Sequence, residues 1–156
     1  MTLSIGDPAP DFTLPDGQGN SVTLSKLKGQ TVVLYFYPRD NTPGCTKEAC
    51  NFRDNYSKFT DANIAVYGIS ADSAKSHQKF TDKYDLPFPL LSDEENQVTT
   101  AYDAYGLKKF MGKEYMGIIR STVVIAPDGT IAQIYKKVKT ATHAEDILPD
   151  LINLQT

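Results

Sequence analysis

The sequence predicts an α/β fold in which helices flank one central mixed sheet, with a β-hairpin at the N-terminus. Three observations lead to this expectation. An apolar run at residues 32–37 is typical of a strand buried on both faces. Strand-like and helix-like segments then alternate along the chain, which favours parallel strands joined by helices. The chain has 156 residues, 40% of them hydrophobic, so we expect residues 1–156 to form one domain with its own core.

The first third of the chain contains signals for a hairpin, a central strand and a helix. Residues 12–14 and 22–24 resemble short strands around a turn that contains two glycines. The run at residues 32–37 ends at a proline and is expected in the middle of the sheet. A helix is expected from Pro43 to about residue 59, because apolar side chains recur there at spacings of three and four. Thr42 precedes it as a candidate cap, and Pro43 suits its first turn.

The middle of the chain continues the alternation. We expect a strand at residues 64–70, a helix at 73–84 and a short strand at 89–92. Ser92 and Glu95 have the spacing of a capping box, in which each side chain satisfies the other residue's backbone donor. This pattern predicts a further helix that starts directly after the short strand.

The last third is expected to contain a second hairpin and a final helix. Residues 118–126 and 131–135 have strand character, and the turn between them contains a Pro-Asp-Gly sequence. Thr142 begins another capping pattern ahead of an amphipathic segment. In that helix, His143 would be a surface residue of the first turn.

Composition excludes several classes of function. Sixteen basic and nineteen acidic residues give a formal charge of −3, which argues against nucleic acid as a partner. The longest apolar run is far shorter than the roughly 20 residues of a membrane span, so no membrane partner is expected. The N-terminus lacks the basic start and apolar stretch of a signal peptide, so we expect a cytoplasmic protein.

The two cysteines, Cys45 and Cys50, are five residues apart, and the chain has only two histidines. This supply of ligands is too small for a zinc site, so no metal is expected. Two cysteines are also too few for a disulfide scaffold. Two interpretations remain at this point: the cysteines are small buried hydrophobic residues, or they are reactive thiols.

The position of Cys45 favours a reactive thiol. Near the start of a helix, unpaired backbone N–H groups and the helix dipole stabilise a thiolate. The Thr42 hydroxyl can face the same pocket, and Pro38 stiffens the loop that shields the thiolate. Arg120 interrupts an apolar strand, where an arginine is costly unless it meets an anion. Arg120 is therefore the candidate cation, although a strand-end arginine that reaches solvent is the simpler alternative.

The segment from Pro38 to Cys50 resembles the active-site loop of the peroxiredoxins. The family pattern is Pro, three residues, Thr, two residues, Cys, and Pro38, Thr42 and Cys45 match it. With Cys50 and an Arg-Ser-Thr sequence at residues 120–122, the chain is similar to the Q-type, or bacterioferritin comigratory protein, subfamily. This resemblance extends over nearly the whole chain and implies a thioredoxin-like fold.

The resemblance also implies roles for individual residues. Cys45 matches the peroxidatic cysteine, and Cys50 matches the resolving cysteine of many members. The residue at the position of Arg120 holds the thiolate and the peroxide in this family. Thr42 takes a hydrogen-bonding role and Pro38 a shielding role. Glu48 matches an acidic position in the active-site helix of the family.

The implied activity is the reduction of hydrogen peroxide and organic hydroperoxides without a bound cofactor. Cys45 would become a sulfenic acid and then form a disulfide with Cys50, which thioredoxin or a similar dithiol would reduce. The sequence contains nothing that demands an oligomer, so a monomer is expected. Two alternatives stay open: a thioredoxin-like disulfide reductase, although the two-residue cysteine spacing is absent, and a redox-sensing interaction module without turnover.

Overall fold

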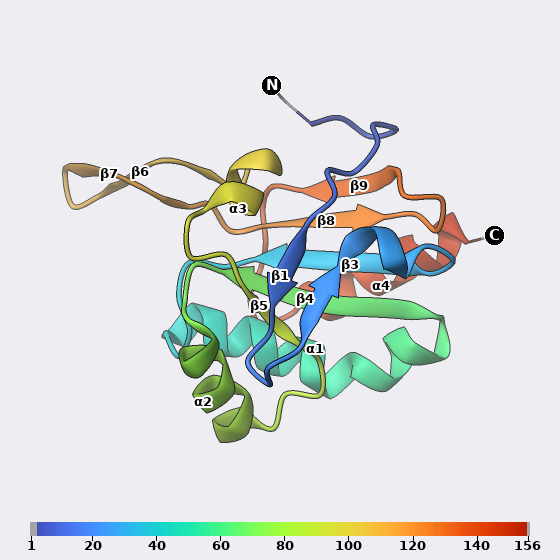
Figure 1. The fold of residues 1–156 in the computed structure, drawn as a ribbon, viewed down its shortest axis with the longest axis horizontal. Coiled ribbons are helices and arrows are strands. Elements are labelled where there is room, and N and C mark those ends of the chain that lie inside the picture. The colour runs from blue at the N-terminus through green and yellow to red at the C-terminus, as the bar shows by residue number, and fades with distance from the viewer. Residues whose placement is uncertain (1–2, 156) are drawn as a thin grey trace.

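The computed structural model describes residues 3–155, and its main feature is a five-stranded mixed sheet (Figure 1). The strands are β1 (Thr13–Pro15), β2 (Ser21–Thr23), β3 (Thr31–Phe36), β4 (Ile64–Ser70), β5 (Leu90–Ser92), β6 (Tyr105–Phe110), β7 (Lys113–Ile118), β8 (Ser121–Ile125) and β9 (Ile131–Tyr135). The helices are the 3₁₀ helix η1 (Leu24–Leu27) and the α-helices α1 (Pro43–Asp61), α2 (Ala74–Tyr84), α3 (Gln97–Ala101) and α4 (His143–Leu154).

The strand order in the main sheet is β5-β4-β3-β8-β9. β3, β4 and β5 are parallel to one another, whereas β8 is antiparallel to β3 and β9 is antiparallel to β8. All six residues of β3 are buried, which explains why this strand has no polar alternation. Because Phe36 at the end of β3 pairs with Ser121 at the start of β8, the residues after β3 and those before β8 meet at one sheet edge.

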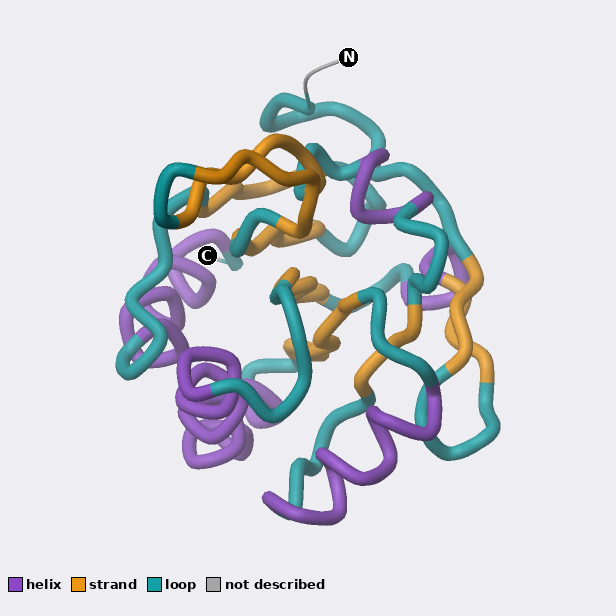
Figure 2. The backbone as a smooth tube through the Cα atoms, turned by 90° about the vertical axis from the view of Figure 1, so that its left-hand side faces the viewer, coloured by secondary structure: helices purple, strands orange, loops and turns teal. Residues whose placement is uncertain are grey.

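The two faces of the sheet are covered differently, as the view turned by 90° also shows (Figure 2). One face packs against α1 and α4, and Phe80 of α2 joins the same hydrophobic cluster. The other face packs against the N-terminal hairpin, η1 and the short helix α3. Helices therefore cover both faces as predicted, but the larger ones lie mainly on one side.

Most of the predicted elements are confirmed by the structure. These include the N-terminal hairpin, the central strand, the helix that begins at Pro43, and the strand and helix that follow it. The hairpin of β8 and β9 is also present. These segments share a strong local signal, namely a sustained apolar period or a turn with glycine.

The capping box expected at Ser92 and Glu95 is wrong. Residues after β5 form a turn instead, and α3 starts later, with Asn96 as its N-cap in a left-handed conformation. The Asp93 carboxylate accepts a hydrogen bond from the backbone N–H of Thr99 at 2.8 Å. Asp93, which precedes α3, therefore provides the hydrogen-bond acceptor for a backbone N–H in the first turn of that helix. The predicted capping box is not required for this role.

The single strand expected at residues 118–126 is also wrong. β7 ends at Ile118 and β8 begins at Ser121, so Arg120 lies in the break between two sheets. The separate hairpin of β6 and β7 projects from the body of the molecule (Figure 1). No sequence pattern predicted this hairpin, because its strands are mostly exposed and carry little apolar alternation.

Within residues 3–155, no helix combines the length and the apolar character that crossing a membrane requires. The first two residues, which contribute to the expectation that a signal peptide is absent, lie outside the described range.

Candidate active site

Cys45 lies where the central strand gives way to the longest helix. β3 ends at Phe36, a loop follows, and α1 begins at Pro43, which occupies the first helical turn where its missing N–H costs nothing. Cys45 is the third residue of α1 and is only 2% exposed. Its sulfur therefore lies at the positive end of the helix dipole, among N–H groups that have no partner within the helix.

Arg120 lies in the break between β7 and β8, and its side chain contacts this thiol. Its Nη2 donates to Cys45 Sγ at 3.1 Å, and its Nη1 donates to Glu48 Oε1 at 2.7 Å. A side chain at Gly44 would come within 3.3 Å of Nη2, so the glycine leaves room for the guanidinium. The arginine that the sequence singled out therefore meets an anionic partner, and the alternative of a solvent-directed arginine is wrong.

Glu48 is fully buried in α1, one turn after Cys45. Burial raises the pKa of Glu48 to about 7, although the ion pair with Arg120 acts in the opposite direction. Its second oxygen, Oε2, has no hydrogen-bond partner among the described residues. Glu48 is therefore held by one charge-assisted hydrogen bond, the one that Arg120 donates.

Arg120 keeps its positive charge in this partly buried position. Burial disfavours the charged form, but Glu48 and Cys45 together raise the pKa of Arg120 above its usual value. The guanidinium thus has two planar donor groups committed to two neighbours, a fork that a lysine cannot reproduce. A thiolate at Cys45 is stabilised both by this charge and by the helix terminus.

The structure corrects one detail for Thr42. Its backbone is extended (φ −94°, ψ 157°) and it is the N-cap residue of α1, but its side chain makes no capping hydrogen bond. The Thr42 hydroxyl donates to the carbonyl oxygen of Arg39 at 3.0 Å instead. Pro38, half-buried, begins this loop directly after the buried Tyr37.

Cys50 is half-buried in the same helix, and both cysteines are free thiols. The next residue, Asn51, connects α1 to α4: its Nδ2 donates to Glu145 Oε1 at 2.9 Å, and its Oδ1 accepts from the backbone N–H of Ala144 at 2.7 Å. Cys45 and Cys50 are thus on one continuous helix, with a firm contact to α4 beside Cys50.

His143 contradicts its predicted surface position. It is 2% exposed, and its Nε2 lies 2.7 Å from Thr122 Oγ1. Burial lowers the pKa of His143 to about 4, Asp146 opposes the shift, and Arg120 contributes to it. The packing of α4 against α1 buries this first-turn residue, which no local pattern could indicate.

Sequence reasoning missed Lys108 as a charge near the site. Its Nζ donates to the Ile118 carbonyl at 2.9 Å, and its pKa is lowered by burial and by Arg120 while Cys45 acts in the opposite direction. Lys108 is on β6, in the hairpin that the sequence did not predict. No residue pattern could have found it without that hairpin.

A buried thiol at a helix N-terminus, paired with an arginine at the edge of a thioredoxin-like sheet, defines a cysteine-based redox enzyme. Comparison with known proteins identifies the family. The chain belongs to the AhpC/TSA family, which matches residues 5–134. Peroxiredoxin Bcp of Bacillus subtilis is 47% identical over 151 residues, which cover 97% of this chain and 96% of that protein. Peroxiredoxin Bcp of Escherichia coli is 44% identical over 146 residues, which cover 94% of each.

Solved structures agree with this assignment. PrxQ of Xylella fastidiosa superposes with a TM-score of 0.93 at 35% identity, over 100% of this chain and 99% of that one. The bacterioferritin comigratory protein of Xanthomonas campestris, described with an alkyl peroxide reduction activity, gives a TM-score of 0.88 at 37% identity, over 93% and 92% of the two chains. The fold is that of a thioredoxin-like peroxiredoxin, and the activity of the chain is that of a thiol peroxidase.

Proposed function

We propose that Cys45 is the peroxidatic cysteine and that Arg120 holds its thiolate and the incoming peroxide. The observation that supports this most directly is the 3.1 Å contact between Arg120 Nη2 and Cys45 Sγ. It combines with a helix terminus that favours the thiolate. In the reaction, the sulfur attacks one peroxide oxygen, an S–O bond forms and the O–O bond breaks. Cys45 leaves the step as a sulfenic acid, and the departing oxygen takes up a proton as water or an alcohol.

The neighbouring residues have supporting roles in this proposal. The Arg120 guanidinium supplies donors for the oxygen on which negative charge develops, and the Thr42 hydroxyl would join it by turning its proton from the Arg39 carbonyl to that oxygen. Pro38 limits access of water to the thiolate. Glu48 fixes the orientation of Arg120 through its 2.7 Å ion pair. The substrates are hydrogen peroxide and organic hydroperoxides, consistent with the alkyl peroxide activity described for the Xanthomonas campestris protein.

Cys50 is proposed as the resolving cysteine. Its sulfur attacks the Cys45 sulfenic acid, an S–S bond forms, and the oxygen leaves as water. An external dithiol, thioredoxin or a similar protein, then reduces the disulfide by exchange. This step requires a compartment that contains reduced dithiol proteins, so we propose that the protein acts in the cytoplasm. All proposed site residues come from residues 38–120 of one chain, so a monomer is sufficient, and we propose that the whole chain acts as one domain.

The test is consumption of peroxide in the presence of thioredoxin, its reductase and NADPH. Cys45→Ser should abolish turnover, because a hydroxyl has a far higher pKa than a thiol and does not attack the O–O bond at neutral pH. Lys47→Ala, a change at an exposed residue in the same turn of α1, is the matched control and should retain wild-type turnover. Turnover that survives in Cys45→Ser contradicts the assignment.

A further inference from the structure

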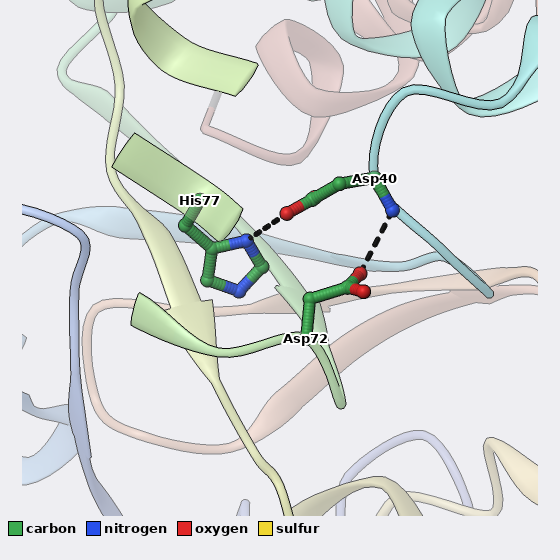
Figure 3. A group of neighbouring side chains, drawn as sticks. All are labelled: Asp40, Asp72 and His77. Atoms are coloured by element: carbon green, nitrogen blue, oxygen red, sulfur yellow. Dashed lines mark hydrogen bonds and ion pairs between the residues drawn. The ribbon is translucent and has the colours of Figure 1, made fainter. Parts of the chain in front are cut away.

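Three ionisable side chains lie together next to the loop that leads to Cys45 (Figure 3). Asp40 belongs to that loop, Asp72 follows β4, and His77 lies in the second turn of α2. His77 Nδ1 is 2.7 Å from Asp40 Oδ2, and the two side chains are 0% and 4% exposed. This group of Asp40, Asp72 and His77 is here called the loop anchor.

The hydrogen-bond partners of His77 fix where its protons lie. Nε2 faces the carbonyl oxygen of Leu91 at 3.0 Å, and a carbonyl only accepts, so Nε2 carries a proton. Nδ1 faces the Asp40 carboxylate at 2.7 Å, where two lone pairs would repel each other. A proton must therefore lie between His77 and Asp40 as well. The buried pair therefore shares one proton in the hydrogen bond between Nδ1 and Oδ2.

The loop anchor is complete without a cation. Asp40 Oδ1 accepts from the Tyr37 hydroxyl at 2.6 Å, and Oδ2 accepts from Ser76 Oγ at 2.8 Å in addition to His77. Asp72 Oδ2 accepts from the Asp40 backbone N–H at 2.8 Å and from Ser70 Oγ at 2.7 Å. The oxygens that face the centre already have donors, so the geometry favours a hydrogen-bonded anchor over a metal site.

The anchor ties one residue of the loop to three separate elements. Tyr37 extends from the end of β3, Asp72 follows β4, and His77 belongs to α2. The chain continues from Asp40 through Asn41, which has a left-handed φ of 59°, and enters α1 two residues later. The position of Asp40 therefore determines the position of the first turn of α1. Cys45 lies in that first turn, and its distance to Arg120 depends on this placement.

We propose that Asp40 and His77 are positioning residues for the oxidation step. The hydrogen bond with their shared proton holds the Cys45 loop in place, and this keeps Cys45 next to Arg120. This inference rests on the proposed role of Cys45. Neither residue contacts the thiol. Their loss should slow the oxidation of Cys45, because a displacement of reacting groups by about 1 Å can lower a reaction rate about a hundredfold.

The experiment measures single-turnover oxidation of the reduced protein by hydrogen peroxide, with no reductant present. Asp40→Asn replaces the carboxylate by an amide of the same shape and removes the shared proton, and His77→Gln removes the ring. Both variants should react about 10- to 100-fold more slowly than wild type. Asp16→Asn is the matched control, since Asp16 is also a buried carboxylate that holds a turn, accepting from the backbone of Gln18 and Asn20. It should react within about twofold of wild type.

A second readout separates positioning from loss of stability, and its decisive measurement is made on the wild type. In the reduced wild-type protein at pH 7, the proton between His77 Nδ1 and Asp40 Oδ2 should give a separate signal far downfield in the ¹H spectrum. That signal should be absent from Asp40→Asn. Absence of this signal from the wild type overturns the shared proton even if the variants fail to fold.

The remaining outcomes are equally decisive. Oxidation of folded Asp40→Asn at the wild-type rate overturns the positioning role. An equal loss in Asp16→Asn also overturns it, because the slowing would then reflect general destabilisation. Failure of the proposed function is distinguishable, since turnover by Cys45→Ser would refute the role of Cys45 and leave the downfield signal of His77 unaffected.

Discussion

Cys45 and Cys50 lie on one helix, but in different surroundings. Cys45 is nearly inaccessible and is held by a guanidinium from outside the helix. Cys50 is half-buried, and its neighbour Asn51 bonds to the start of α4. In the proposed assignment the first site attacks the peroxide with its thiol already held by Arg120, whereas no comparable cation contacts Cys50 among the described residues. If these roles hold, we expect oxidation to depend on the geometry at Cys45 and resolution to require movement of α1.

The largest expected effect concerns that movement. On an ideal helix, residues five apart are about 8.7 Å from Cα to Cα and are turned by about 140° from each other. A disulfide needs less than about 7 Å, so Cys45 and Cys50 cannot pair while α1 is intact. Oxidation should therefore unwind α1 from about Thr42 to Arg53 and leave the central sheet in place. Amides in this segment should exchange with solvent on the order of a thousandfold faster.

Hydrogen exchange on reduced and oxidised protein measures this directly, with the disulfide confirmed by mass. The Ala144 amide is a sensitive reporter, because it donates to Asn51 and loses its partner once unwinding passes Cys50. Cys50→Ser treated with the same peroxide is the control and should keep its protection. Unchanged protection in the disulfide form would refute the unwinding.

The next effect tests the clamp on Cys45. Arg120→Lys keeps a positive charge but cannot donate to Cys45 and Glu48 through one planar fork, so oxidation should slow by about a hundredfold. The measurement is the rate of single-turnover oxidation by hydrogen peroxide. Arg39→Lys, at an exposed arginine in the loop between β3 and α1, is the control and should not change the rate. A wild-type oxidation rate in Arg120→Lys would contradict the proposed role of Arg120 in the oxidation step.

A smaller effect is expected at the second cysteine. Cys50→Ser should be oxidised once at a rate within about twofold of wild type, because it leaves the Arg120 contact with Cys45 in place. Steady-state turnover with thioredoxin should fall by about tenfold or more, since the sulfenic acid then has no internal partner. A sulfenic acid probe with mass detection follows the stalled intermediate. Slow first oxidation in this variant would contradict the division of roles between the two cysteines.

The same comparison shows what the sequence could predict. The surroundings of Cys45 were accessible, because Pro43 and the apolar period of α1 are local signals, and because an arginine in an apolar segment requires an anion. The ion pair of Arg120 with Glu48 joins residues 72 positions apart, and only the resemblance to a family pointed to Glu48. Register between β3 and β8 brings these two together, and no local pattern specifies that register.

The surroundings of Cys50 were predicted less well. The sequence placed His143 at the surface, because a first-turn position after a capping pattern is usually exposed. The structure buries it between Phe52 of α1 and Tyr135 of β9, each packed edge-on against its ring. The loop anchor of Asp40, Asp72 and His77, which lies beside the Cys45 loop, was also missed. Its members are ordinary polar residues in sequence, and only the meeting of three elements makes them a group.

The last prediction concerns the free energy of unfolding and the titration of His143, whose neighbours Phe52 and Ala144 lie close to Cys50. No change is expected in the rate of Cys45 oxidation at neutral pH. Burial lowers the pKa of His143 from 6.5 to about 4, so the folded state favours the neutral ring. The resulting stability is fully present above pH 6.5 and is lost as the pH falls toward 4, because the unfolded chain takes up a proton first. Between pH 7 and pH 5 this group accounts for about 2 kcal/mol of lost stability. His143→Gln can keep a hydrogen bond to Thr122 but does not titrate. Urea unfolding at both pH values should therefore show a smaller loss in the variant, and an identical loss in both proteins would mean that His143 is not the group that titrates.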